Sequence, residues 1–211
     1  TVGFRMPSHP VAIALIEAAG PIAAPSANLF GRPSPTAAQH VKSDLDGKIA
    51  AVLDGGSTGA GLESTIIDMS GGEYRVLRRG GVDLEQIEAC LGKKLKLNTD
   101  GGLSSSGYSL KVKVVIAADE RDMAERMAHY LANGIKYGTV SIGTQEWTGE
   151  PGAAGLRYTL ASGEQGESLY SILRDAEARG LDILLFEPLQ KENSGLSPAM
   201  YDRILKAANK Q

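Results

Sequence analysis

Residues 110–211 alternate between short apolar runs and stretches with helical spacing. The runs "KVKVVIA" and "LDILLFE" are short and bounded, as in the buried strands of a parallel sheet. Met123, Met127 and Leu131 recur along one helical face after Asp119, a capping residue. Because strands alternate with helices, we expect a small open parallel-sheet, Rossmann-like α/β domain. The predicted strands are 111–117, 138–143, 155–161 and 181–187, and the predicted helices follow Asp119, contain 169–176 and open at 197–198.

The first part of the chain has shorter and weaker patterns. We expect strands at 1–6, at 49–53 and within "LESTIIDM" and "YRVLRRGG", and helices at 11–18, 36–44 and 82–91. The polar stretch "NTDGGLSSSG" is typical of a linker. We therefore divide the chain into residues 1–97, a linker at 98–109, and residues 110–211. Since Thr1 falls in the middle of the first expected strand, we expect the chain to be part of a longer protein.

Composition narrows the class of protein. The 211 residues carry a net charge of -3, which argues against binding to nucleic-acid phosphates as the main function. The single cysteine, Cys90, excludes an internal disulfide. The sequence has no signal-peptide pattern and no apolar run of about 18 residues, so we expect a cytoplasmic protein without a membrane partner.

The loop "GPIAAPSANLFGRPSPTAAQH" at residues 20–40 is stiffened by prolines and lined by small residues. Ser26, Asn28 and Ser34 supply hydroxyl and amide groups, and the helix expected after them offers free N–H groups that suit a phosphate. The alternative is that Ser34 or Thr36 only caps this helix and that Asn28 only closes a turn.

Two further segments carry candidate binding groups. In "GLESTIID", strand alternation places Ser64 on one face and Glu63 with Thr65 on the other. Their hydroxyls and carboxylate could hold a small polar substrate; the alternative is that Thr65 only reflects the ordinary use of threonine in strands. Arg78 ends a strand beside two glycines, as in a phosphate or carboxylate clamp, although strand-end arginines are often solvated. Arg5 lies among apolar residues and would pair with a ligand carboxylate or with an internal acid.

The motifs "VGFRMPSHP", "APSANLFGRPSPT", "LDGG…GLESTIID" and "VLRRGG" together resemble the YrdC-type domain of threonylcarbamoyl-AMP synthases. The motifs "GLDILLFEPLQ" and "GLSPAMYDRILKAA" resemble the C-terminal domain of the long, two-domain members. The resemblance implies the C-terminal part of a YrdC-type α/β domain followed by the small Rossmann-like domain. It also implies that the N-terminal half of the YrdC-type domain is absent, so we expect these residues alone to be inactive.

The resemblance implies an enzyme that makes threonylcarbamoyl-AMP and pyrophosphate from L-threonine, bicarbonate and ATP. The product would pass to a downstream tRNA threonylcarbamoyl transferase, with tRNA contacts that are indirect or weak. By likeness, ATP would contact Thr1, Ser26, Asn28, Ser34 and Arg78, with Tyr108 as a lid candidate. Threonine would contact Arg5 and either Ser64 or Thr65.

No catalytic side chain is expected, because the resemblance implies a reaction that proceeds by positioning. Mg²⁺ is expected on the ATP phosphates, and no carboxylate cluster in the sequence would hold it alone. Two alternatives stay open: an RNA-binding module and a regulatory, non-catalytic domain.

Overall fold

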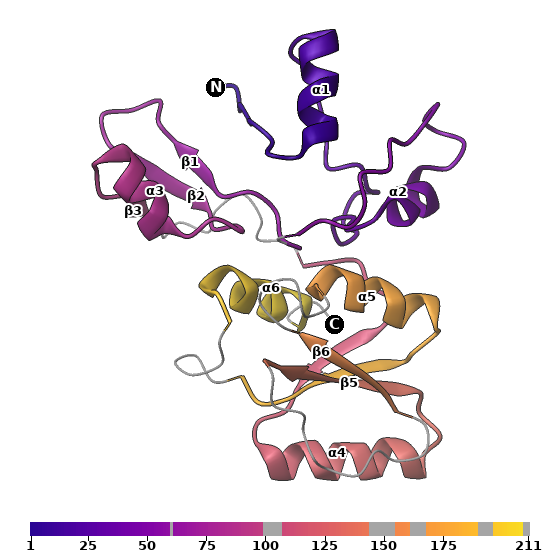
Figure 1. Cartoon of the computed structure of the whole chain (residues 1–211). Helices are drawn as coiled ribbons and strands as arrows, with labels where there is room; N and C mark the ends of the chain where they lie inside the picture. Colours follow the sequence, from indigo (N-terminus) through magenta and orange to yellow (C-terminus); the bar gives the residue numbers. More distant parts are fainter. Residues whose placement is uncertain (60, 99–106, 144–154, 161–167, 190–195, 209–211) are drawn as a thin grey trace.

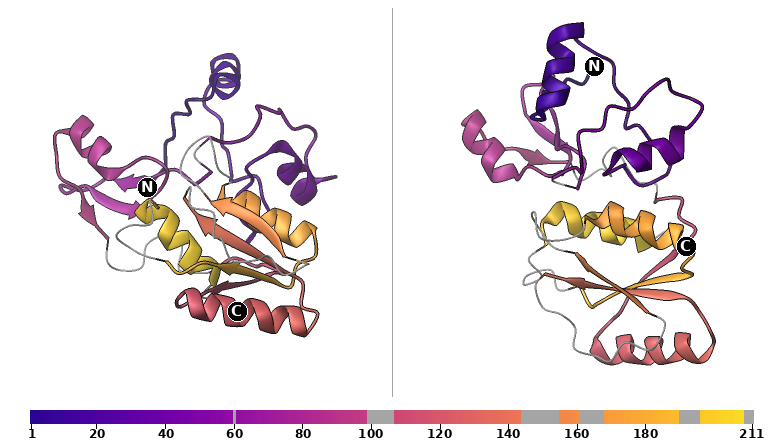
Figure 2. Two further views of the ribbon diagram at one scale, coloured as in Figure 1. Left: turned by 60° about the horizontal axis from the view of Figure 1, so that its bottom comes forward. Right: turned by 45° about the vertical axis from the view of Figure 1, so that its right-hand side comes forward.

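The computed structural model describes residues 1–59, 61–98, 107–143, 155–160, 168–189 and 196–208. The second half of the chain is a four-stranded sheet with helices on both faces, and the first half carries a separate three-stranded sheet. Helices α5 (Leu169–Ala178) and α6 (Pro198–Ala208) lie between the larger sheet and the first half of the chain (Figures 1 and 2). These two helices are therefore placed to contact the predicted ligand-binding segments.

The larger sheet has the strand order β4-β7-β5-β6, and all its described pairs are parallel. Its strands are β4 (Lys113–Ile116), β5 (Tyr137–Ile142), β6 (Leu156–Leu160) and β7 (Ile183–Phe186). Helix α4 (Glu120–Ala132) follows β4, and α5 connects β6 with β7. The predicted open parallel α/β fold is thus confirmed.

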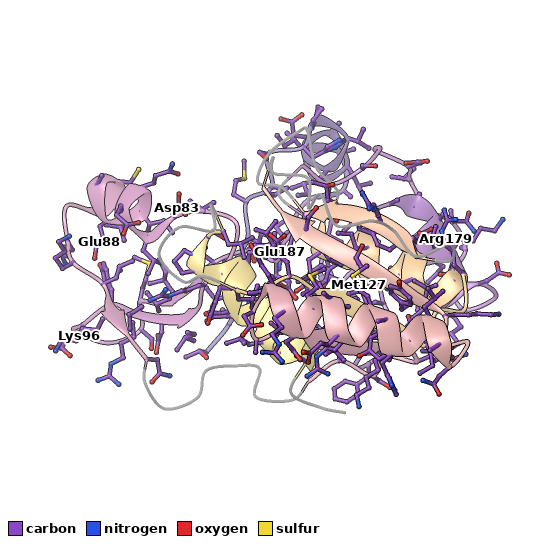
Figure 3. All side chains as sticks on the ribbon, turned by 90° about the horizontal axis from the view of Figure 1, so that it is seen from below. Asp83, Glu88, Lys96, Met127, Arg179 and Glu187 are labelled. Carbon is purple, nitrogen blue, oxygen red and sulfur yellow. The ribbon has the colours of Figure 1, made fainter. Side chains whose placement is uncertain are left out.

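Each face of this sheet is covered by helices. Leu184 belongs to the core under α5 and α6, whereas its neighbour Leu185 packs with Met123 and Met127 of α4. This alternation is the strand period of two. Figure 3 looks onto α4, with Met127 labelled, from the face opposite to α5 and α6.

Two of the predicted helix starts, at Asp119 and Ser197, are formed by side-chain caps, whereas the capping role considered for Ser34 or Thr36 is wrong because α2 begins after Ala37 without a side-chain cap. The carboxylate of Asp119 accepts the Asp122 backbone N–H at 2.8 Å, and the Ser197 hydroxyl accepts that of Met200 at 3.2 Å. Such caps satisfy N–H groups that have no partner within the helix.

The first half has three described helices and the smaller sheet. In chain order its elements are α1 (Pro10–Ala19), α2 (Ala38–Leu45), β1 (Ile66–Asp68), β2 (Arg75–Arg78), α3 (Leu84–Leu91) and β3 (Lys96–Leu97). β2 pairs antiparallel with β1 and parallel with β3. In Figure 3 the labelled Asp83, Glu88 and Lys96 mark α3 and the smaller sheet, to one side of the larger sheet.

Two strands predicted in the first half are wrong. Residues 1–6 and 49–53 form no strand, and Val2, Phe4 and Met6 are largely exposed. A strand needs a neighbour that pairs with its backbone, and no described segment pairs with these residues. The two-residue strand β3 was not expected, because so short a segment has no measurable period.

No helix in the described part of the chain has the length and apolarity to cross a bilayer. The division into residues 1–97, 98–109 and 110–211 stays a prediction, since residues 99–106 of the expected linker lie outside the described residues.

Candidate functional site

The proline-rich loop contains an unusual backbone conformation beside an unpaired acceptor. Ala27 has a φ of 55°, and it is the one described non-glycine residue with a positive φ. The Asn28 amide donates to the carbonyls of Leu29 at 2.9 Å and Arg32 at 3.1 Å, while its Oδ1 is buried without a partner among the described residues. An unpaired buried acceptor costs about 1–3 kcal/mol, and such features gather at ligand sites.

A buried ion pair fixes the other end of this loop to α5. The Arg174 guanidinium donates to both oxygens of Asp44 in α2, at 3.1 and 2.7 Å, and to the carbonyl of Pro33 at 2.6 Å. Both charged side chains are 4% exposed. Burial raises the pKa of Asp44, but the hydrogen bond and charge of Arg174 outweigh it, so this pKa lies below its ordinary value.

A second set of contacts attaches the loop to the start of the C-terminal sheet. Arg32 lies 3.0 Å from the carboxylate of Glu177, which also accepts the backbone N–H of Lys111 at 2.7 Å. The N–H of Ser109 donates to the carbonyl of Gly31 at 2.8 Å. The candidate nucleotide loop is therefore held by the second half of the chain.

Thr65 is held against the end of β2. Its hydroxyl donates to the carbonyl of Val82 at 2.8 Å and accepts the N–H of Gly80 at 3.1 Å. A Cβ atom on Gly80 would lie 2.2 Å from the carbonyl oxygen of Glu63, so only glycine fits this approach. The tight backbone contact fixes the segment that carries both Ser64 and Thr65.

Arg78 lies on the same segment from the β2 side. Its Nε and Nη2 donate to the carbonyl of Ser64 at 3.2 and 3.0 Å, and Nη2 lies 3.5 Å from the Ser64 hydroxyl. These contacts bring together a guanidinium and a hydroxyl, two groups that bind carboxylates and phosphates.

Glu63 connects three separate segments. Its Oε1 accepts the hydroxyl of Ser34 at 3.3 Å, and its Oε2 accepts the hydroxyl of Tyr170 at 2.7 Å and the Nε of Arg203 at 3.1 Å. Burial raises the pKa of Glu63, but the Tyr170 hydrogen bond and the Arg203 charge outweigh it and hold this pKa below its ordinary value. The carboxylate is therefore ionised at neutral pH.

Cationic groups outnumber this carboxylate. Burial lowers the pKa of Arg78, and the nearby charges of Arg203 and Arg5 lower it further, whereas Glu63 raises it. Among the described residues no carboxylate lies within ion-pair distance of Arg5 or Arg78. Arg78 and Arg203 outnumber the one acid, Glu63, and the charge of Arg5 reaches Arg78 as well, so the site is net positive, which suits an anionic ligand.

Of the other candidate residues, Thr1 and Ser26 take no part in the described hydrogen bonds around Glu63, and Tyr108 is linked to Glu63 through Tyr170. Thr1 and Ser26 are exposed and make no side-chain hydrogen bond among the described residues. Tyr108 is 8% exposed, and its hydroxyl lies 2.7 Å from that of Tyr170; burial raises the pKa of Tyr108 to about 12. The ligand contacts predicted for all the candidate residues stay predictions.

The histidines serve local structure. His9 Nδ1 accepts the N–H of Val11 at the start of α1, and His40 Nδ1 accepts the N–H of Thr36. Within the described residues there is no group of three or more His, Cys, Asp or Glu side chains that could hold a metal ion.

The sequence reasoning missed Tyr170, Arg174 and Arg203. All three lie on the buried faces of α5 and α6. An arginine within an apolar helical stripe indicates a buried ion pair. That signal was present, but the partners, Asp44 and Glu63, are more than a hundred residues away.

Two family models match most of the chain. Residues 82–209 match the family described as "Threonylcarbamoyl-AMP synthase, C-terminal domain". The chain belongs to the threonylcarbamoyl-AMP synthase family. Residues 1–80 match the family of Sua5, YciO and YrdC proteins, described as "Telomere recombination".

Members of this family from distant organisms align with nearly the whole chain. The threonylcarbamoyl-AMP synthases of Bacillus subtilis and Pyrococcus abyssi are 38% and 35% identical over 99% of the chain. The crystal structure of P. abyssi Sua5 complexed with L-threonine superposes with a TM-score of 0.77 and 33% identity, and covers 97% of the chain. The chain spans 63% and 64% of the length of the two relatives and 63% of that structure.

Proposed function

We propose that the protein containing this chain is a threonylcarbamoyl-AMP synthase that uses L-threonine, bicarbonate and ATP. The observation that carries the proposal is the net positive site around Arg78, whose guanidinium lies 3.5 Å from the Ser64 hydroxyl and is influenced by the charges of Arg203 and Arg5. Threonine and ATP are both anionic, and both present groups that hydroxyls and guanidiniums recognise.

The reaction needs no protein nucleophile. The amine of threonine and bicarbonate combine to a carbamate with loss of water. A carbamate oxygen then attacks the α-phosphorus of ATP, the bond to the β-phosphate oxygen breaks, and pyrophosphate leaves. The protein contributes by placing the two substrates and by offsetting the charge on the phosphates.

The residues divide between the two substrates. Arg5 pairs with the threonine carboxylate, and Ser64 or Thr65 holds the amino acid. Ser64 is the better placed of the two, because the Thr65 hydroxyl already bonds Val82 and Gly80.

ATP is assigned to the loop and its neighbours. Its contacts would come from Thr1, Ser26, Asn28, Ser34 and Arg78, with Tyr108 as the lid candidate. The unpaired Oδ1 of Asn28 is the acceptor that a nucleotide N–H group could satisfy.

A protein-held Mg²⁺ site does not fit the described residues. The one carboxylate in the network, Glu63, already accepts hydrogen bonds from Ser34, Tyr170 and Arg203. Any Mg²⁺ would have to arrive with the ATP phosphates.

The product would supply a tRNA threonylcarbamoyl transferase in the cytoplasm, and contact with tRNA itself would be indirect or weak. An RNA-binding module is less well supported, because the net charge of the chain is -3 and the candidate site contains few aromatic side chains for base stacking.

Pyrophosphate release by the intact gene product tests the proposal. We expect release from ATP only when threonine and bicarbonate are both present, and none from residues 1–211 alone. Tight RNA binding without release would favour the RNA-binding module. Release without threonine would contradict the assignment of Arg5 and Ser64.

A further inference from the structure

Glu63 lies where both predicted substrate sites meet the C-terminal helices. Its side chain bonds Ser34 of the nucleotide loop on one oxygen, and Tyr170 of α5 and Arg203 of α6 on the other. Its main chain leads directly into Ser64 and Thr65, the predicted threonine contacts. A shift of this one carboxylate would move both sites.

The backbone of Glu63 has little freedom. Its main-chain carbonyl oxygen accepts the N–H of Gly81 at 3.0 Å, and this carbonyl approaches Gly80 so closely that no side chain fits on residue 80. Arg203 also donates to the carbonyl of Arg79 at 3.1 Å, so α6 binds both backbone segments that flank the predicted site.

Behind Glu63 the hydroxyls form a directed chain. Because the Tyr170 hydroxyl donates to Glu63, the Tyr108 hydroxyl donates to Tyr170 at 2.7 Å. The two rings meet edge to face, with centroids 5.7 Å apart. Tyr170 is 1% exposed, so water does not replace this donor. The C-terminal core thus presents one oriented O–H group and one guanidinium to Glu63.

We infer that Glu63 is a positioning residue, held by Tyr170 and Arg203, that sets the distance between the threonine and ATP sites. The inference rests on the proposed function and assigns the two C-terminal helices a part in the reaction. Glu63 does not touch substrate in this account. It acts through Ser34 and Ser64, and a small misplacement of reacting groups lowers the rate steeply.

The test uses the intact gene product with Tyr170→Phe, Glu63→Gln and their double variant. Tyr170→Phe keeps the ring and removes the O–H that Glu63 accepts. We expect kcat to fall about tenfold to a hundredfold in each single variant. The affinity for threonine alone, measured by calorimetry, should change less than threefold, because relative placement matters only when both substrates are bound. The double variant should be no slower than the slower single variant.

Tyr158→Phe is the matched control. The Tyr158 hydroxyl donates to Asp175 at 2.8 Å in the same core, away from Glu63. It should lose a comparable amount of stability while its kcat stays within twofold of wild type. Arg203→Lys should retain more kcat than Arg203→Met, since it keeps a charge beside Glu63.

The possible outcomes distinguish the positioning role of Glu63 from the proposed synthase function. An active wild-type enzyme with unchanged kcat in Tyr170→Phe and Glu63→Gln overturns the positioning role alone. Equal loss of kcat in Tyr158→Phe does the same, because it would indicate a general effect of stability. A wild-type protein without pyrophosphate release overturns the proposed function, and the positioning role with it.

Discussion

The buried pair of Asp44 and Arg174 predicts a large loss of stability when one partner is removed. Asp44→Ala would leave the Arg174 side chain, which is 4% exposed, with the carbonyl of Pro33 as its remaining hydrogen-bond partner among the described residues. Breaking a buried pair in this way costs about 3–5 kcal/mol, because a desolvated charge loses its counter-ion. The lost stability would come from a weaker contact between α5 and the nucleotide loop.

Equilibrium unfolding in urea measures this effect. With a slope of about 2 kcal/mol per molar, the midpoint should fall by about 1.5 to 2.5 M in Asp44→Ala. Asp46→Ala is the matched control, because Asp46 is an exposed acid two residues further along. The free energy of unfolding of Asp46→Ala should stay within about 0.5 kcal/mol of the wild-type value.

A double variant distinguishes a buried charge from lost contacts. Asp44→Ala with Arg174→Met removes both charges, so its loss of stability should be smaller than that of Asp44→Ala alone. Equal midpoints for Asp44→Ala and Asp46→Ala would refute the claim that this ion pair holds the loop. A double variant with fully additive losses would refute the role of the uncompensated charge.

Three further predictions concern the candidate site. Gly80→Ala should lower stability by about 1–3 kcal/mol in thermal unfolding, since its Cβ would meet backbone atoms at 2.2–2.3 Å, whereas Gly72→Ala meets nothing within 4 Å and should be neutral. The pKa of Glu63 lies below its ordinary 4.5, so the stability that the ionised Glu63 contributes is complete above pH 4.5 and is lost as the pH falls through the lowered pKa. Glu63→Gln should flatten this part of the plot of stability against pH, and an unchanged plot would contradict the ionised, hydrogen-bonded state of Glu63. Arg5→Ala should raise the KM for threonine about tenfold or more in the pyrophosphate assay, while Arg75→Ala, whose side chain is 61% exposed, should not; equal effects would remove Arg5 from the site.

The C-terminal α/β fold could be predicted because its signals are local. Short apolar runs mark each strand, and Asp119 and Ser197 mark helix starts by their own hydrogen bonds. The strands expected at 1–6 and 49–53 failed for the opposite reason. Pairing depends on a partner segment that the local sequence does not specify.

The candidate site divides in the same way. Motifs and residue chemistry indicated Ser34, Ser64 and Arg78, which lie in short contiguous stretches of the chain. Tyr170 and Arg203 contact Glu63 only because α5 and α6 pack against the first half of the chain. No local sequence pattern could therefore predict that Glu63 is their partner. The unpaired Oδ1 of Asn28 likewise follows from the folded loop and not from its sequence.

The most direct test of the proposed synthesis is to identify its product. The intact gene product should be incubated with ATP, threonine and bicarbonate labelled with heavy carbon, and the nucleotides analysed by mass spectrometry. The account predicts an adenylate that contains threonine and the labelled carbon, together with pyrophosphate. An adenylate without the label, or no adenylate at all from a folded protein that binds both substrates, would contradict it.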